Sequence, residues 1–455
     1  MIVRNVEVEG RPGLDVRLDG GRIAEIGPKL AARGDEIDGR GGALIPGLCD
    51  HHIHLFGFAA RADSVVLEDA ASLADVAARI ARATAARPPG AWIRALGYHE
   101  TIAGDLTRAD LDRLAPRHRL RMQHQTGALW VLNSMALDSL PSHDDPAGLE
   151  RETGRLWRGD AWLRARMDAQ PPPLAPIGRR LASYGITALT DASVTTDADA
   201  AARLAEAHRS GALPQRLTLM SGGALAAPAD GAYAVGPVKV LLDDHALPDL
   251  DDFLARIADA RAWARPVAVH CVTAGELALT LAAFGTAGAQ VGDRVEHGGV
   301  IGAEAVGELK ALGLTVVTQP AFIRERGDRY AAQVDPADQP DLYRCASLRA
   351  AGVPVAASSD APYASADPWV GIRAAIDRTS IGGRVMCAGE AVDAATALSL
   401  YLGDPADPGG PSRRVGVGAA ADLALLDAPL REVLAQPSAE RVRATLVAGA
   451  VVSGG

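Results

Sequence analysis

The feature that most constrains the fold is a series of eight short apolar segments that alternate with alanine-rich amphipathic stretches. Most of these segments contain β-branched residues, which favour strands, and the stretches between them, such as residues 252–265, 274–283 and 303–312, have helical periodicity. Strands that alternate with helices predict parallel βα units, and eight such units close into a barrel. The expected strands are residues 43–49, 186–192, 216–220, 238–242, 266–271, 293–297, 315–319 and 354–359.

The two ends of the chain have a different pattern, in which apolar and polar residues alternate with a period of two. At the N-terminus residues 1–8, 14–18 and 22–26 show this pattern. Near the C-terminus residues 422–426 and 445–452 are similar. We therefore expect a small β-sandwich domain that is assembled from residues 1–45 and 405–455, with the barrel over residues 46–404.

The interval between the first two expected strands is far longer than one helix needs. It contains a strand-like segment at residues 92–98 and a helix-like segment at 108–114. Since structureless loops of this length are rare, we expect a folded insert at about residues 56–176 that acts as a lid and sets specificity. The aromatic residues of the insert either shape a substrate pocket or form its own core; they include Trp92, Tyr98, Trp130 and Trp157.

Composition and charge exclude several classes of protein. The net charge of −10 disfavours broad binding to nucleic acid or anionic lipid, and 48% hydrophobic with 22% charged residues is ordinary globular usage. No uninterrupted apolar run approaches the ~18 residues of a spanning helix, and the first residues lack a signal-peptide pattern. The four cysteines lie far apart and form no Cys-x-x-Cys pair. We expect a cytoplasmic protein that acts on a small molecule, and the apolar content permits a homodimer.

The strongest local signal is the sequence Asp50-His51-His52-Ile53-His54, which follows the first expected strand. Side chains alternate along a strand, so His52 and His54 share a face and His51 points the other way. Two imidazoles on one face can hold a divalent metal ion. The alternative is a chance or packed polar pair, and His51 is expected to be structural.

Four further candidate residues lie in expected strands of the same series or just after them. Lys239 lies in the middle of an apolar strand, where a buried amine must be paired, neutralised or modified, unless it snorkels from an edge strand. His270 and His297 also end expected strands, and each taken singly fits a hydrogen-bonded core histidine. Asp360 follows a Ser-Ser pair, and its alternative is a helix N-cap or a turn former.

Together these residues favour a metal site more strongly than any of them does alone. They fall on expected strands one, four, five, six and eight, and barrel active sites collect where the strands end. The predicted metal ligands are His52, His54, Lys239, His270, His297 and Asp360.

With this ordered set the chain resembles the amidohydrolase superfamily, and within it the branch called amidohydrolase family 3. The resemblance covers nearly the whole chain. Besides the six ligand candidates, the motifs that carry it are residues 92–98 (WIRALGY), 106–112 (LTRADLD), 133–137 (NSMAL), 185–187 (GIT), 296–297 (EH) and 359–362 (SDAP).

The resemblance implies a (β/α)8 barrel with a small β-sandwich and one or two divalent metal ions, often zinc, at the C-terminal mouth of the barrel. It implies that His52 and His54 bind the more buried ion together with Asp360. His270 and His297 would bind the second ion, and Lys239, carboxylated on its Nζ atom, would bridge the two.

The expected reaction is hydrolysis of a non-peptide C–N bond in an amide, N-acyl compound, carbamate or cyclic amide. A metal-activated hydroxide attacks the carbonyl carbon, and Asp360 passes the proton to the leaving nitrogen. Residues 126–128, 241–245 and 271–276, which face substrate in the family, depart from its usual motifs, so the resemblance does not identify the substrate.

Two other functions remain open. Deamination of a heterocycle ranks second, because mononuclear deaminases of the superfamily usually carry Glu where this chain has Thr273, and because Lys239 favours two metal ions. A non-catalytic scaffold ranks third, since such relatives usually lose metal ligands. Arg155 and Arg158 in the insert fit either an acidic group of the substrate or surface ion pairs.

Overall fold

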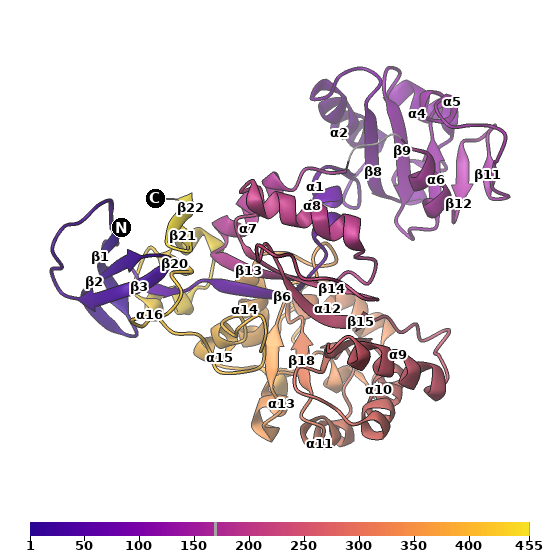
Figure 1. Cartoon of the computed structure of the whole chain (residues 1–455). Helices are drawn as coiled ribbons and strands as arrows, with labels where there is room; N and C mark the ends of the chain where they lie inside the picture. Colours follow the sequence, from indigo (N-terminus) through magenta and orange to yellow (C-terminus); the bar gives the residue numbers. More distant parts are fainter. Residues whose placement is uncertain (168–170, 455) are drawn as a thin grey trace. The chain divides into compact units, whose positions relative to one another are not determined.

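The computed structural model describes residues 1–167 and 171–454. The chain divides into two units, one formed by Met1–Leu55 with Leu174–Gly455 and the other by Phe56–Pro173 (Figure 1). The first unit contains a parallel barrel and two small sheets in which most strand pairs are antiparallel. The second unit is built around a sheet of its own, and the two are described separately below.

The barrel is an eight-stranded parallel sheet in the order β19-β18-β17-β16-β15-β14-β13-β6. The backbone N–H of Asp360, just past β19, donates to the carbonyl of His52 on β6 at 2.8 Å, which joins the two ends of the sheet. The predicted eight-stranded (β/α)8 architecture is therefore confirmed. The strands are β6 (Leu48–Ile53), β13 (Ile186–Asp191), β14 (Arg216–Ser221), β15 (Ala234–Val240), β16 (Val267–Cys271), β17 (Arg294–His297), β18 (Thr315–Thr318) and β19 (Val355–Ala357).

Helices follow the barrel strands and surround them (Figure 1). Several begin at a side chain that caps the first turn; for example, the Thr273 hydroxyl accepts from the Glu276 N–H at the start of α10. The helices of this unit are α7 (Ala175–Ser183), α8 (Ala198–Arg209), α9 (Leu250–Ala262), α10 (Ala274–Ala287), α11 (Ala303–Ala311), α12 (Ala321–Gln333), α13 (Ala346–Ala351), α14 (Pro368–Asp377), α15 (Ala394–Ser399) and α16 (Leu430–Ala435).

The first barrel strand differs from the expected segment 43–49. That apolar run is split at Gly47: β5 (Leu44–Pro46) pairs antiparallel with β20 (Leu423–Leu426) outside the barrel, and β6 begins at Leu48. A side chain at position 47 would place its Cβ 2.1 Å from the Thr187 Cγ2 atom, so this close approach requires glycine. The expected boundary was wrong because residues 44–46 and 48–49 are all apolar and only Gly47 lies between them.

The two remaining sheets of this unit share one core. The first has the order β3-β2-β1-β4, and the second β22-β21-β20-β5. Val3 and Val16 from the first sheet pack with Leu44, Leu423 and Leu446 from the second. The additional strands are β1 (Ile2–Val8), β2 (Arg11–Asp19), β3 (Arg22–Gly27), β4 (Glu36–Asp38), β21 (Val442–Val447) and β22 (Ala450–Gly454).

The unit Phe56–Pro173 is built on a six-stranded mixed sheet in the order β11-β12-β10-β9-β8-β7. One face packs against α2 and α4 through a core that includes Tyr98, and a second core contains Trp130. Trp157 is exposed. Tyr98 and Trp130 therefore form part of the core of the insert itself.

The strands of this unit are β7 (Val65–Val66), β8 (Trp92–Tyr98), β9 (Arg119–His124), β10 (Leu129–Leu132), β11 (Leu149–Glu150) and β12 (Arg155–Trp157). Its helices are α2 (Leu73–Ala85), α3 (Glu100–Ala103), α4 (Arg108–Leu114), α5 (Ser134–Asp138) and α6 (Asp160–Arg166), and α1 (Leu55–Ala62) begins at the unit boundary.

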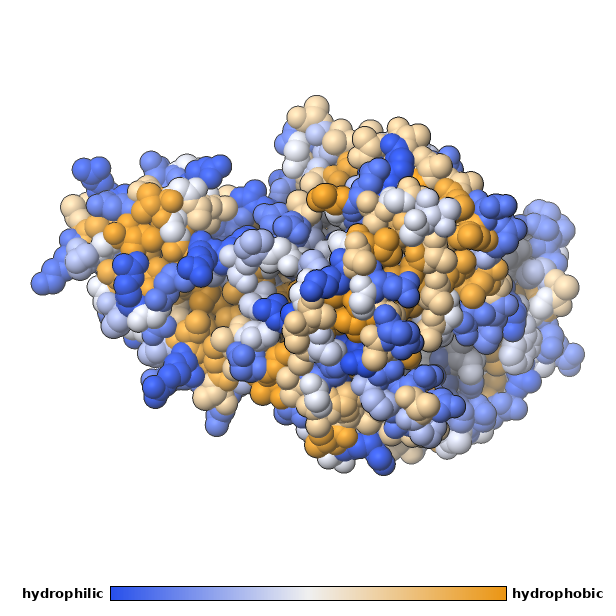
Figure 2. Space-filling model, turned by 90° about the horizontal axis from the view of Figure 1, so that it is seen from below, coloured by the Kyte–Doolittle hydropathy of each residue, from blue (hydrophilic) through white to orange (hydrophobic). Residues whose placement is uncertain are grey.

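In the described part of the chain no helix is both long and apolar enough to cross a membrane. Hydrophilic and hydrophobic residues are interspersed over the face of the molecule that Figure 2 shows.

Candidate metal centre

His52, His54 and Asp360 converge where β6 and β19 end. The Nε2 atoms of His52 and His54 lie 3.4 and 3.2 Å from the Oδ1 atom of Asp360. Both histidines therefore present Nε2 to one carboxylate oxygen, as expected for two side chains on the same face of a strand. The three donor atoms are close enough together to hold one metal ion. His51 points away and is fully buried, with its Nδ1 atom 3.4 Å from the Cys49 sulfur.

A buried charged pair on β17 fixes the ring of His52. The Nδ1 atom of His52 donates to Oε2 of Glu296, and the other oxygen of Glu296 accepts from the Arg294 guanidinium at 2.5 Å. Glu296 is fully buried and Arg294 nearly so. With the proton held on Nδ1, the Nε2 lone pair of His52 faces Asp360 and is available to a cation.

His270 and His297 bring two more imidazoles to the same end of the barrel. The ring centroids of His297 and His270 lie 4.5 Å apart, and those of His297 and His52 lie 4.8 Å apart. The Nδ1 atom of His297 donates to Oε1 of Gln319 at 2.9 Å, which leaves its Nε2 as the lone-pair atom. Burial lowers the pKa of His270 to about 4 and that of His297 well below its ordinary value, so both rings are neutral at pH 7.

Lys239 lies inside the barrel on β15, with 3% of its surface exposed. Its Nζ atom has no hydrogen-bond partner among residues 1–167 and 171–454. Burial lowers the pKa of this amine, although the charges of Glu296 and Asp360 oppose the effect. The snorkelling alternative is wrong for Lys239, because β15 is an interior strand of the barrel, between β14 and β16.

The backbone of Asp360 has an uncommon conformation. Its φ of 54° lies in the left-handed region, which costs a non-glycine residue about 1 kcal/mol or more, and His297 has a φ of 70°. Burial raises the pKa of the Asp360 carboxyl, and the neighbouring His54 opposes this. Beside it, Asp50 accepts from both the N–H and the hydroxyl of Ser359, which ties β6 to the segment that carries Asp360.

The donor set fits a divalent metal ion. In the described part of the chain three buried polar atoms at this point lack hydrogen-bond partners: His52 Nε2, Lys239 Nζ and Asp360 Oδ1. An unsatisfied buried polar atom costs about 1–3 kcal/mol, so three together are unfavourable unless a further group binds them. Neutral imidazoles and a carboxylate are ligands that suit zinc and similar divalent ions.

The structure also explains Thr273 and Glu276, which follow the histidine of β16. The Glu276 carboxylate accepts from the backbone N–H groups of Val272 and Thr273 at 2.6 and 3.0 Å, and Glu276 is 1% exposed. Both residues therefore form the capping box of α10. Neither is free to act as the acid–base residue that a mononuclear deaminase would need at this place.

A second group of possible metal ligands lies in the inserted unit and consists of His99, Glu100 and His124. The Nδ1 atoms of the two histidines accept from the backbone N–H groups of Thr101 and Thr126, both at 3.2 Å. The Nε2 atoms therefore carry the protons, and His124 Nε2 donates to Glu100 at 2.9 Å. Since protonated Nε2 atoms have no lone pair to offer, this arrangement is a hydrogen-bonded trio rather than a metal centre.

All six predicted ligand candidates thus lie at one end of the barrel, whereas the sequence did not identify the residues that orient them. Arg294 and Glu296 could have been found as opposite charges two residues apart in an apolar strand, but nothing in the sequence pairs Gln319 with His297. Arg155, which was considered for substrate binding, forms an ion pair with Asp105 at 3.3 Å.

Known proteins share this architecture along nearly the whole chain. A sequence profile described as the amidohydrolase family matches residues 35–453. An N-substituted formamide deformylase from Arthrobacter pascens is 25% identical over 500 aligned residues, which cover 93% of this chain and 92% of the deformylase.

Two solved structures have the same fold. The crystal structure of an uncharacterized metal-dependent hydrolase from Pyrococcus horikoshii OT3 superposes with a TM-score of 0.77 at 18% identity, over 94% of this chain and 97% of that one. N-isopropylammelide isopropylaminohydrolase from Burkholderia multivorans superposes with a TM-score of 0.54 at 18% identity, over 100% of this chain and 98% of that one. The chain belongs to the amidohydrolase family.

Proposed function

We propose that this hydrolase of C–N bonds releases a carboxylic acid and an amine from a small non-peptide amide, and that N-substituted formamides are the first substrates to test. The observation that carries the proposal is the convergence of four histidines, Lys239 and Asp360 at the end of one barrel. The similarity to the Arthrobacter pascens deformylase over most of both chains supports the choice of formamides.

We assign the metal ligands as follows. His52, His54 and Asp360 would hold one divalent ion, for which zinc is our proposal, and His270 and His297 would hold a second. Lys239 would serve as a ligand shared by both ions if carbon dioxide converts its amine to a carbamate; the burial that lowers the pKa of this amine, and the lack of a hydrogen-bond partner for Nζ in the described part of the chain, support this modification. When bound, such ions lower the pKa of water and polarise a carbonyl group.

Asp360 is the proposed proton carrier. Its Oδ1 atom has no hydrogen-bond partner in the described part of the chain, and burial raises the pKa of its carboxyl, so it can accept a proton from the attacking water. It then delivers the proton to the leaving nitrogen. Glu296 and Gln319 take no part in the proton transfer; they hold the rings of His52 and His297.

The compartment and the assembly remain proposals. All four cysteines are free thiols and three of them are buried, which agrees with a reducing compartment such as the cytoplasm. We also propose a homodimer, which the apolar content of the chain permits.

The experiment that tests the function is reconstitution followed by product analysis. The protein is treated with a chelator, dialysed, and supplied with Zn²⁺ or Mn²⁺ before assay on N-substituted formamides, other N-acyl compounds, cyclic amides and heterocyclic amines. We expect a metal-dependent release of formate with the corresponding amine. Release of ammonia from a heterocyclic amine, with no acid product from any amide, would instead establish deamination. Full activity without metal would refute both.

A further inference from the structure

Two arginines lie side by side on one face of the sheet in the inserted unit. Arg94 on β8 is in register with Arg121 on the parallel neighbour β9. Their sequence neighbours Ile93 and Leu120 are buried in the core that α2 and α4 cover. Since side chains alternate along a strand, the two arginines occupy the opposite face of the sheet.

Both guanidinium groups lie against the ring of Trp130 and form no ion pair with another described residue. Their central carbons lie 5.7 and 5.1 Å from the ring centroid of Trp130, and both Nε atoms are buried without a hydrogen-bond partner among residues 1–167 and 171–454. The nearby Asp160 accepts from Trp130 Nε1 at 2.9 Å and forms no ion pair with either arginine in the same ranges.

Burial and mutual repulsion make the arrangement unfavourable for two positive charges. Burial lowers the pKa of Arg94, and burial together with the charge of Arg94 lowers the pKa of Arg121 to about 10, although the charge of Asp160 opposes both shifts in part. Both groups are still charged at neutral pH. Like charges held together in a partly desolvated site indicate that the site is completed by a negative charge.

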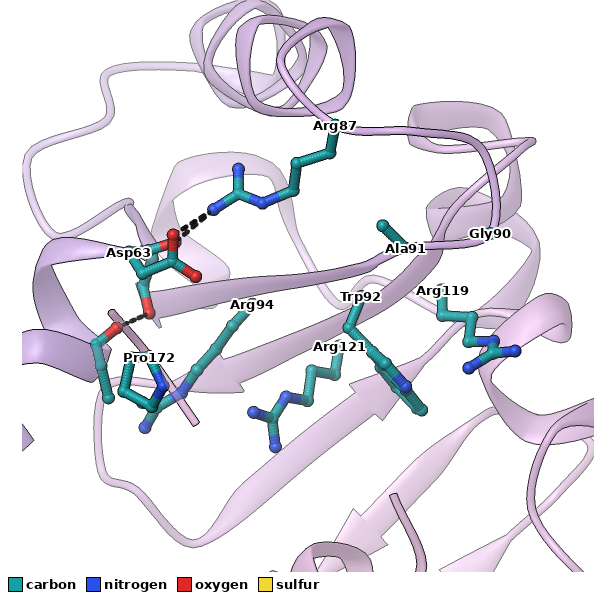
Figure 3. Close-up of a pocket in the computed structure, with 11 residues that line it drawn as sticks. Asp63, Arg87, Gly90, Ala91, Trp92, Arg94, Arg119, Arg121 and Pro172 are labelled. Atoms are coloured by element: carbon teal, nitrogen blue, oxygen red, sulfur yellow. Dashed lines mark hydrogen bonds and ion pairs between the residues drawn. The ribbon is translucent and has the colours of Figure 1, made fainter. Parts of the chain in front are cut away.

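A cavity of about 450 Å³ opens next to these groups, and Arg94 and Arg121 are among the residues that line it (Figure 3). Arg87 also lines it, but this guanidinium is paired with Asp63 at 2.6 Å. The indole of Trp92 adds an aromatic wall. The cavity thus combines an apolar surface with two guanidiniums that form no ion pair with a carboxylate of residues 1–167 or 171–454.

We propose that this cavity is a binding site for the oxyanion of a small molecule, a carboxylate or a phosphate, which Arg94 and Arg121 hold between them, while the body of the ligand lies against Trp92. The planar fork of a guanidinium donates two parallel N–H groups to such an oxyanion, and Trp130 supports both forks from below by cation–π contact. The site lies wholly within the inserted unit and does not depend on the proposed reaction.

The test is a titration of the full chain with inorganic phosphate and, separately, with succinate, each followed by tryptophan fluorescence and by thermal unfolding. Chloride at matched ionic strength measures simple screening. We expect a saturable response to at least one oxyanion, and a loss of affinity of about tenfold or more in the double variant Arg94→Gln/Arg121→Gln, since two charge-assisted contacts are removed. Without anion, the double variant should be at least as stable as the wild type, because a repulsion is relieved.

Arg113→Gln is the control for each single substitution, Arg94→Gln and Arg121→Gln, since it removes one positive charge from the exposed side of α4 and should bind as the wild type does. If the double variant does not fold, Arg94→Lys and Arg121→Lys replace it. Lysine keeps the positive charge but lacks the planar guanidinium that donates two parallel N–H groups, so these variants should also weaken binding. A response to phosphate alone identifies a phosphate-bearing ligand, and a response to succinate alone a carboxylate. The proposal is overturned if neither anion acts beyond chloride, or if the arginine variants bind as tightly as Arg113→Gln.

Discussion

The Nδ1–H of His52 donates to the carboxylate of Glu296, which lies 244 residues further along the chain. The bond connects the first barrel strand to the sixth and determines which nitrogen of His52 faces Asp360. Because Arg294 holds the other oxygen of Glu296, the orientation of a candidate metal ligand depends on a buried ion pair.

We expect Glu296→Gln to weaken metal binding by about 10–100-fold, the usual effect of losing a partner that orients a metal ligand. The amide keeps the size of the side chain but leaves the buried Arg294 without its counter-charge. Metal content after dialysis against a series of zinc buffers measures the change. Glu308→Gln on the exposed side of α11 is the control. Wild-type zinc affinity in Glu296→Gln would show that the pair is only structural.

Asp360→Asn should lower kcat by roughly 10²–10⁴, the range for loss of a general acid–base residue. Asparagine still offers an oxygen to a metal ion but cannot carry the proton. Steady-state kinetics and metal analysis are done on the same preparation, so that loss of metal is separated from loss of the base. A decrease of less than about threefold at unchanged metal content would contradict the proposed role.

Lys239→Ala should lose at least one metal ion and most of the activity, because the bridging group disappears. Short carboxylic acids are expected to restore part of the activity by occupying the space that the side chain leaves. Lys310→Ala on α11 is a surface control that makes the same substitution away from the centre. If the wild type is fully active with one metal ion per chain and electron density shows an unmodified Lys239, the bridge is ruled out.

Glu390 should make the stability depend on acidic pH. Burial raises the pKa of its carboxyl, but hydrogen bonds from Ser347 and Cys345 and the charge of Arg344 outweigh it, so that the folded-state pKa lies below the ordinary 4.5. The unfolded chain therefore binds more protons as the pH falls below about 4.5, and the stabilisation is lost through the folded-state pKa.

At pH 7 we expect Glu390→Gln to lower the free energy of unfolding by about 1–3 kcal/mol, the cost of losing hydrogen bonds to a buried charge. The difference from the wild type should shrink when urea denaturation is repeated below pH 4. An unchanged difference between the two pH values would show that Glu390 is not ionised in the folded protein.

The sequence predicted the barrel and the six candidate ligands because both depend on features that repeat along the chain. The end of a strand can be located in the sequence to within a few residues. Because barrel active sites collect where the strands end, this already places the last side chain of each strand near the site. The split at Gly47 was missed, since the residues on both sides of it, 44–46 and 48–49, are apolar.

Pairs of residues that meet only in the folded protein could not be predicted. Arg155 and Arg158 were singled out from the sequence because they lie next to Trp157, yet Arg155 is paired with Asp105. Arg94 and Arg121 were not considered as a pair, because their contact depends on the register between β8 and β9. Register is set by tertiary packing and not by either strand alone.

The antiparallel pairing of β5 with β20 has a consequence for the order in which the protein is made. Leu44 and Pro46 lie opposite Leu425 and Leu423. β5 therefore cannot pair with β20 until almost all of the chain has been synthesised. Only Gly47 separates β5 from the strand that carries His52. We therefore expect nascent chains that stop before β20 to hold the first histidines loosely, and maturation of the centre to follow the completion of synthesis.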